Sequence, residues 1–111
     1  MLLGGELVEG KGSPIEVVDP SSEEPIASIA SASPDQVAAA IASAKEAFPG
    51  WKLTPAPDRG EMLQALARWM RDHTEELAIT LTKEGGKPLV ENRDEIGWSA
   101  SCLDFYAVLG R

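Results

Sequence analysis

The fold of this chain is decided by residues 17–51, which read VVDPSSEEPIASIASASPDQVAAAIASAKEAFPGW. Ser33 can accept hydrogen bonds from the free amides of a helix start, Pro34 suits the first helical position, and Gln36 completes a capping box. Pro49-Gly50 is expected to end this helix, because proline interrupts helical hydrogen bonding. Between these two signals the apolar residues predict an amphipathic helix with one face formed by Val37, Ile41, Ala44 and Phe48.

The residues before this helix predict a hairpin and short strands. Two short apolar runs flank Gly4-Gly5, and paired glycines supply the positive φ of a tight hairpin turn. The β-branched run Ile15–Val18 predicts a strand, and residues 19–22 have the composition of a turn. Apolar and small residues alternate from Pro25 to Ser31, where we expect another strand.

The residues after this helix predict three more helices. The second is expected to begin near Thr54-Pro55 or Asp58, and its apolar stripe comprises Met62, Leu66, Trp69 and Met70. Thr74 is expected to cap a third helix that Gly85-Gly86 closes. A fourth is expected over about Leu89–Leu109, with an apolar side formed by Ile96, Ala100, Leu103 and Ala107. Taken alone, the chain is therefore predicted to be mostly α.

Composition narrows the class of protein. A chain of 111 residues forms at most one ordinary domain. Its net charge of −8 argues against binding nucleic acid or an anionic membrane, because both need a basic surface. It has one cysteine, no signal-peptide pattern and no apolar run of about 18 residues, so a cytoplasmic location is expected.

Three features invite a chemical interpretation, and each has a simpler structural one. Cys102 lies among apolar residues without a nearby histidine, so we expect a buried structural cysteine. His73, at the end of the second helix, is expected to interact with the last carbonyls of that helix. Gly85-Gly86-Lys87 lacks the spacing of a phosphate-binding loop, and Pro88 replaces the required Ser or Thr. We therefore predict no catalytic and no cofactor-binding residue in this chain.

Aromatic residues of the fourth helix indicate a surface that this chain cannot cover. Phe105 and Tyr106 follow Trp98 by seven and eight residues, so all three lie on roughly one side. Core packing is the simpler explanation, yet the helix is apolar on more than one face. Exposing an aromatic forgoes about 1.5–3 kcal/mol of burial. Part of this helix is therefore expected to pack on something outside the chain.

Several motifs follow one another along the whole chain: Leu3–Val8, Val18-Asp19-Pro20 with the following Ser21–Glu24, Ala44–Trp51, Arg59, Glu84–Pro88 and Phe105-Tyr106-Ala107. In this order and spacing they resemble the N-terminal region of the NAD(P)-dependent aldehyde dehydrogenases. Asp19 stands where that family usually has asparagine.

The resemblance implies an α/β parent with a Rossmann-type cofactor domain. Residues 1–111 would form the N-terminal part of that domain, with the hairpin and strands in residues 1–31 and the helices in residues 32–111. The parent would oxidise an aldehyde to a carboxylic acid with NAD or NADP, using a cysteine thiolate and a glutamate that activates water. Cys102 does not match the motif of that nucleophile, and members of the family are several times longer.

The resemblance also implies two minor features of this region. A structural cation would lie between a backbone carbonyl at Val17 or Val18 and the carboxylate of Glu95, although Gly97 occupies the strict family position. The last helix would border the aldehyde entry tunnel, which Trp98 or Phe105 would line. The general likeness favours a small aliphatic aldehyde or a semialdehyde as the parent's substrate.

Three hypotheses follow for the chain itself. In the first, it is an N-terminal fragment of such an oxidoreductase, inactive alone, which binds no cofactor tightly and packs on the rest of a parent that forms homo-oligomers. In the second, it is a non-catalytic interaction module that self-associates through its last helix. In the third, it is a small enzyme with an unrecognised site.

Overall fold

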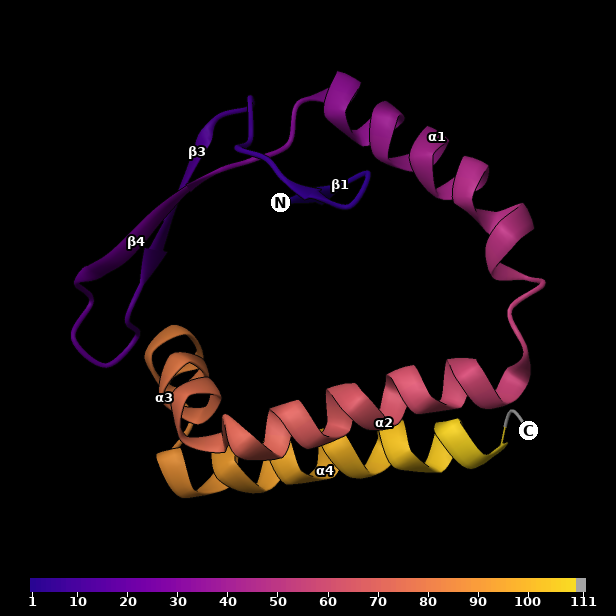
Figure 1. The fold of residues 1–111 in the computed structure, drawn as a ribbon. Helices are drawn as coiled ribbons and strands as arrows, with labels where there is room; N and C mark the ends of the chain where they lie inside the picture. Colours follow the sequence, from indigo (N-terminus) through magenta and orange to yellow (C-terminus); the bar gives the residue numbers. More distant parts are fainter. Residues whose placement is uncertain (110–111) are drawn as a thin grey trace. The chain divides into compact units, whose positions relative to one another are not determined.

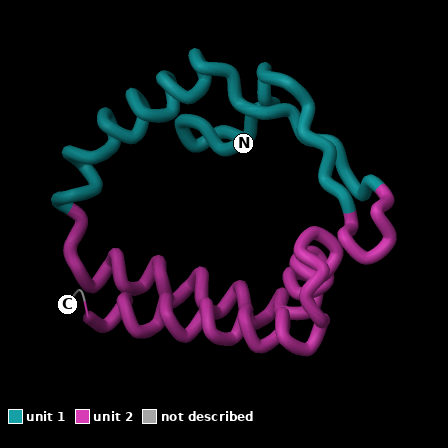
Figure 2. The backbone as a smooth tube through the Cα atoms, turned by 180° about the vertical axis from the view of Figure 1, so that it is seen from behind, with its two compact units in different colours: residues 1–18, 25–53 teal, residues 19–24, 54–111 magenta. Residues whose placement is uncertain are grey.

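A computed structural model describes residues 1–109. The chain divides into two compact units, coloured separately in Figure 2. Residues 1–18 and 25–53 form the first unit, and residues 19–24 join the stretch from Thr54 onward in the second. Each unit is described by itself below.

The first unit begins with the expected hairpin. Strands β1 (Leu2–Leu3) and β2 (Glu6–Leu7) pair antiparallel around Gly4 and Gly5. The two glycines have φ angles of 61° and 89°, a region that side chains with a Cβ seldom adopt. The prediction that paired glycines make this turn is confirmed.

Strands β3 (Pro14–Val18) and β4 (Pro25–Ala30) form a second two-stranded antiparallel sheet. Ile15 pairs with Ile29, and the register shifts between Val17 and Val18. Each strand opens with a proline, a position at which a missing amide is tolerated. Both predicted strands are confirmed to within a residue at either end.

Helix α1 (Pro34–Trp51) begins as its sequence predicts. The Ser33 hydroxyl accepts a hydrogen bond from the Gln36 amide, and the Gln36 side chain accepts one from the Ser33 amide. The expectation that Pro49-Gly50 ends the helix is wrong. Proline removes only its own amide, and the Lys52 amide still bonds to the Phe48 carbonyl.

Gln36 also holds the loop that precedes β3. Its carboxamide oxygen accepts a hydrogen bond from the Lys11 amide at 2.8 Å, and its nitrogen donates to the Glu9 carbonyl at 2.8 Å. The side chain is buried and every polar atom has a partner. One residue therefore fixes both the start of α1 and the path of residues 9–11.

The second unit contains α2 (Ala56–Asp72), α3 (Thr74–Gly85) and α4 (Leu89–Leu109). Helices α2 and α4 lie side by side along their lengths (Figure 1). Their approach is close because the facing residues are small, with Gly60 against the backbone of Ala107. The buried apolar residues of this unit are Ala67, Ala78, Ile96, Ala100 and Ala107.

The side of α2 that faces α4 is not the apolar stripe read from the sequence. Ala67 is fully buried, whereas Met62, Leu66 and Trp69 remain about half exposed. Small residues, rather than the large apolar ones, form the contact between α2 and α4, because they allow the two backbones to approach closely. The larger side chains are left without a cover within the second unit.

The ends of α3 show one wrong prediction and one confirmed. Thr74 does not cap α3: its hydroxyl donates to the Arg71 carbonyl at 2.8 Å and so satisfies the end of α2. The residue before α3 is His73, which makes no side-chain capping bond. Gly86 ends the helix as expected, in a left-handed conformation with φ 72°.

A buried polar residue ties α4 to α3. Asn92 is 2% exposed, and its amide nitrogen donates to the Thr82 hydroxyl at 2.8 Å and to the Lys87 carbonyl at 3.2 Å. Arg93, one residue later, forms two hydrogen bonds with the Glu75 carboxylate at 2.7 and 2.8 Å. These contacts fix the first turns of α4.

None of the helices in residues 1–109 has both the length and the apolar composition needed to cross a bilayer.

Candidate functional site

The most conspicuous surface of the second unit is one side of α4, here called the outer face. With about 3.6 residues per turn, residues spaced by three, four, seven or eight recur on one side of a helix. The buried residues Ile96, Ala100 and Ala107 occupy the opposite side. The outer face, extended back to the loop before the helix, comprises Lys87, Glu91, Asp94, Glu95, Trp98, Ser101, Cys102, Phe105 and Tyr106.

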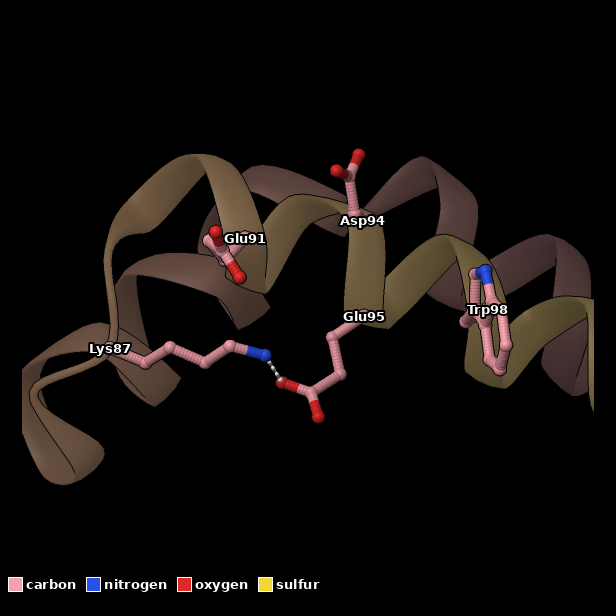
Figure 3. A pocket seen from close by; sticks show the side chains of 5 residues that line it. All are labelled: Lys87, Glu91, Asp94, Glu95 and Trp98. Atoms are coloured by element: carbon pink, nitrogen blue, oxygen red, sulfur yellow. Dashed lines mark hydrogen bonds and ion pairs between the residues drawn. The ribbon is translucent and has the colours of Figure 1, made fainter.

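The first half of the outer face is acidic. An open hollow of about 320 Å³ is lined by Lys87, three carboxylates and Trp98, as Figure 3 shows. The Lys87 ammonium donates to the Glu95 carboxylate at 2.9 Å, and this hydrogen bond raises the pKa of Lys87 above its ordinary value. The charges of Glu91 and Asp94 act in the same direction. This half therefore carries a net negative charge.

The second half of the outer face is aromatic. A second open hollow of about 320 Å³ is lined by Trp98, Ser101, Cys102, Phe105 and Tyr106. Trp98 is 77% exposed, and Phe105 and Tyr106 are about 60% exposed. The last two rings meet edge to face with their centroids 5.3 Å apart. Within the second unit this aromatic surface is uncovered, and what packs on it stays a prediction.

Cys102 lies on this aromatic half, so the prediction of a buried cysteine is wrong. The apolar neighbours that suggested burial lie on both sides of α4: Ala100 faces the core, whereas Phe105 faces outward. None of the residues lining the hollow supplies an imidazole, ammonium or guanidinium group beside the thiol. A reactive thiol needs such a neighbour or a helix N-terminus, and Cys102 lies in the second half of α4.

His73 takes the structural role predicted from its position. Its Nδ1 lies 2.8 Å from the carbonyl oxygen of Trp69, and its ring stacks on the Trp69 ring with centroids 4.2 Å apart. The imidazole is thus held against the end of α2. Gly85-Gly86-Lys87 likewise forms a helix end rather than a phosphate loop, because Gly86 caps α3 and the Lys87 ammonium is paired with Glu95.

Two polar arrangements were not predicted from the sequence. Gln36 bonds to backbone groups 25 and 27 residues away, and no local pattern announces such partners. The Lys87–Glu95 pair spans eight residues across the start of α4. Lys87 lies in the loop before α4, outside the helical periodicity that places Glu95, so no local pattern predicts this pair.

Comparison with known proteins decides the family. Residues 7–111 match the sequence profile described as "Aldehyde dehydrogenase family". The chain belongs to the aldehyde dehydrogenase family. The resemblance inferred from the motifs is thereby confirmed over nearly the whole sequence.

Curated aldehyde dehydrogenases match this chain with about one-third identity. The NADP(+) succinate-semialdehyde dehydrogenase GabD of Escherichia coli (strain K12) is 32% identical over 111 residues, which cover 99% of this chain and 23% of that enzyme. The N-succinylglutamate 5-semialdehyde dehydrogenase of Pseudomonas fluorescens (strain Pf0-1) is 34% identical over 96 residues, 86% of this chain and 20% of that enzyme. The chain therefore spans about a quarter or less of these relatives.

Solved aldehyde dehydrogenase structures share the fold. The crystal structure of an NAD-dependent benzaldehyde dehydrogenase from Corynebacterium glutamicum superposes with a TM-score of 0.94 and 30% identity. The match covers 98% of this chain and 24% of that one. The predicted fold class, a mostly helical piece of an aldehyde dehydrogenase, is confirmed.

Within residues 1–109 of this aldehyde dehydrogenase chain, the strands and the charged hollow do not fit a dinucleotide. Both sheets within residues 1–109 are two-stranded and antiparallel, so no parallel strand–helix–strand unit presents a helix start to a pyrophosphate. The hollow beside Lys87 is lined by three carboxylates, which repel phosphate. No step of cofactor chemistry is therefore assigned to these residues.

The implied cation site stays a prediction. Val18 ends β3 in one unit, whereas Glu95 lies on α4 in the other. The Glu95 carboxylate is engaged by Lys87. Residues 1–109 hold no group of three or more histidine, cysteine or acidic side chains arranged for a metal ion.

Proposed function

We propose that this chain is the N-terminal part of an enzyme that oxidises an aldehyde to a carboxylic acid with NAD or NADP. The observation that carries the proposal is the family match over residues 7–111, combined with the structural likeness to an NAD-dependent benzaldehyde dehydrogenase over 98% of this chain. A cytoplasmic location is part of the proposal and is supported by the single cysteine, which cannot form an internal disulfide.

In this proposal the catalytic and cofactor-binding residues lie outside the 111 residues. The geometry of the two candidate groups supports this division. Cys102 has no basic partner among the residues that line its hollow, and His73 is held against Trp69. The chain then contributes structure, and its isolated form binds neither NAD nor NADP tightly.

The role proposed for the outer face is packing against the remainder of the enzyme. Exposed aromatic area on this scale is uncommon on a free-standing domain and usually marks an interface. Helix α1 adds a second uncovered apolar side, formed by Val37, Ile41 and Phe48, in the first unit. The relatives, of which this chain spans about a quarter, have the additional length needed to cover such surfaces.

The decisive experiment is to read the source genome beyond the codon for Arg111 and to assay the product of that reading frame. We expect the longer protein to reduce NAD or NADP when an aldehyde is added, and the 111-residue chain to show no such reduction. Reduced nicotinamide is followed by its absorbance. A natural stop codon at that point would overturn the proposal that this product oxidises aldehydes.

The substrate class is tested on the same longer protein. We propose a small aliphatic aldehyde or a semialdehyde, supported by the semialdehyde dehydrogenases among the curated relatives. We expect a higher kcat/KM for succinate semialdehyde than for benzaldehyde. The reverse order would contradict this assignment and leave the proposed reaction type intact.

The packing of the outer face is tested at Cys102. In the isolated chain its thiol is exposed, so a maleimide reagent is expected to label it fully in the native state when the chain is kept dilute enough to prevent aggregation. In the longer protein the same position should be protected until denaturant is added, as measured by peptide mapping in a mass spectrometer. Rapid labelling in the folded longer protein would show that the face remains open.

A second candidate function is a stand-alone interaction module that self-associates through the outer face. The exposure of Trp98, Phe105 and Tyr106 favours it. Sedimentation of the 111-residue chain separates the two candidates. A module should form a discrete oligomer that Trp98→Ser dissociates and Val90→Ser does not, since Val90 is also exposed but outside the aromatic hollow. Ill-defined aggregation is expected for a part of a larger enzyme.

A further inference from the structure

No further inference is drawn: the strongest candidate, the exposed aromatic surface of α4 formed by Trp98, Phe105 and Tyr106, belongs to the site already described, and nothing in the structure shows what covers it.

Discussion

The carbonyl oxygen of Ala107 lies where a side chain on Gly60 would have to stand. A Cβ added to Gly60 would come within 2.7 Å of that oxygen, a separation that real Cβ contacts do not reach. The glycine is thus the reason that α2 and α4 can pack with their backbones close together.

Gly60→Ala is therefore expected to destabilise the second unit. Replacing a glycine inside a helix by alanine normally gains roughly 0.5–1 kcal/mol. Here the contact with the Ala107 backbone should turn this gain in the free energy of unfolding into a loss, because overpacking of this kind costs roughly 1–3 kcal/mol. The urea midpoint of unfolding checks it. Gly97→Ala is the matched control, because a Cβ on Gly97 meets nothing within 4 Å, and this change should stabilise. Equal effects of both changes would refute the close-contact explanation.

Gln36→Ala should lower the free energy of unfolding of the first unit more than an alanine substitution at a surface residue does. It removes the acceptor for the Lys11 and Ser33 amides and the donor to the Glu9 carbonyl. A buried polar group left unpaired costs roughly 1–3 kcal/mol, so a loss of about 2–3 kcal/mol is expected. Thermal unfolding measures the loss, and hydrogen exchange of the Lys11 amide should accelerate.

Gln64→Ala in α2 serves as the control for this change, because Gln64 is neither buried nor within the first unit. Gln36→Glu keeps the acceptor oxygens and loses the donor, so its cost should be intermediate. A Gln36→Ala protein as stable as the Gln64→Ala protein would show that the loop before β3 is held by other contacts.

The Glu75–Arg93 pair predicts a dependence of stability on pH. The hydrogen bond from Arg93 lowers the pKa of Glu75 below its ordinary value. A carboxylate with a lowered folded-state pKa stabilises the fold above its unfolded pKa, and the contribution is lost as pH falls through the folded pKa. Glu75→Gln should thus lower the melting temperature slightly at neutral pH, and the difference from the parent should shrink below about pH 4.

The neighbouring residue provides the control for the ion pair. Glu76→Gln removes the same charge at the adjacent position of the first turn, where residues 1–109 supply no ion-pair partner. If both substitutions give the same pH profile, the effect arises from the charge near the helix start and not from Arg93.

Gly86→Ala should destabilise the end of α3. Gly86 has φ 72°, a conformation that costs a residue with a Cβ roughly 1–2 kcal/mol. A Cβ there would also lie 2.7 Å from the Pro20 ring, in the same unit. We expect a loss of at least about 1–2 kcal/mol in chemical denaturation. Gly85→Ala, one residue earlier and without contacts at its Cβ position, should have no such cost.

Much of the secondary structure could be predicted from the sequence, because the deciding signals are local. Ser33 and Gln36 lie within one helical turn of each other, and Gly4-Gly5 and Gly86 have backbone angles that favour glycine. The wrong predictions concern residues whose type suits a local role but whose hydrogen bonds go to another element. Thr74 has the composition of a cap, but its hydroxyl satisfies the helix before it rather than the one after it.

The outer face could be predicted in outline but not in detail. Periodicity places Trp98 and Phe105 on one side of a helix. Because α4 is apolar on more than one side and the chain has few elements to cover it, part of the helix is predicted to be exposed. The same periodicity places Cys102 on that side, whereas its apolar neighbours along the chain favour burial, and the exposed thiol shows that periodicity is the better guide here. Contacts between residues distant in sequence, such as Gln36 with Lys11, depend on the path of the loop and leave no local pattern.

The uncovered outer face has a consequence during synthesis. A ribosome makes α4 before any residue that follows it, so Trp98, Phe105 and Tyr106 leave the ribosome uncovered by the rest of their own unit. Growing chains in this state can associate with one another through their exposed apolar surfaces. The net charge of −8 opposes that association by repulsion between neighbouring nascent chains, and the carboxylates of Glu91, Asp94 and Glu95 lie on the same face as the aromatic rings.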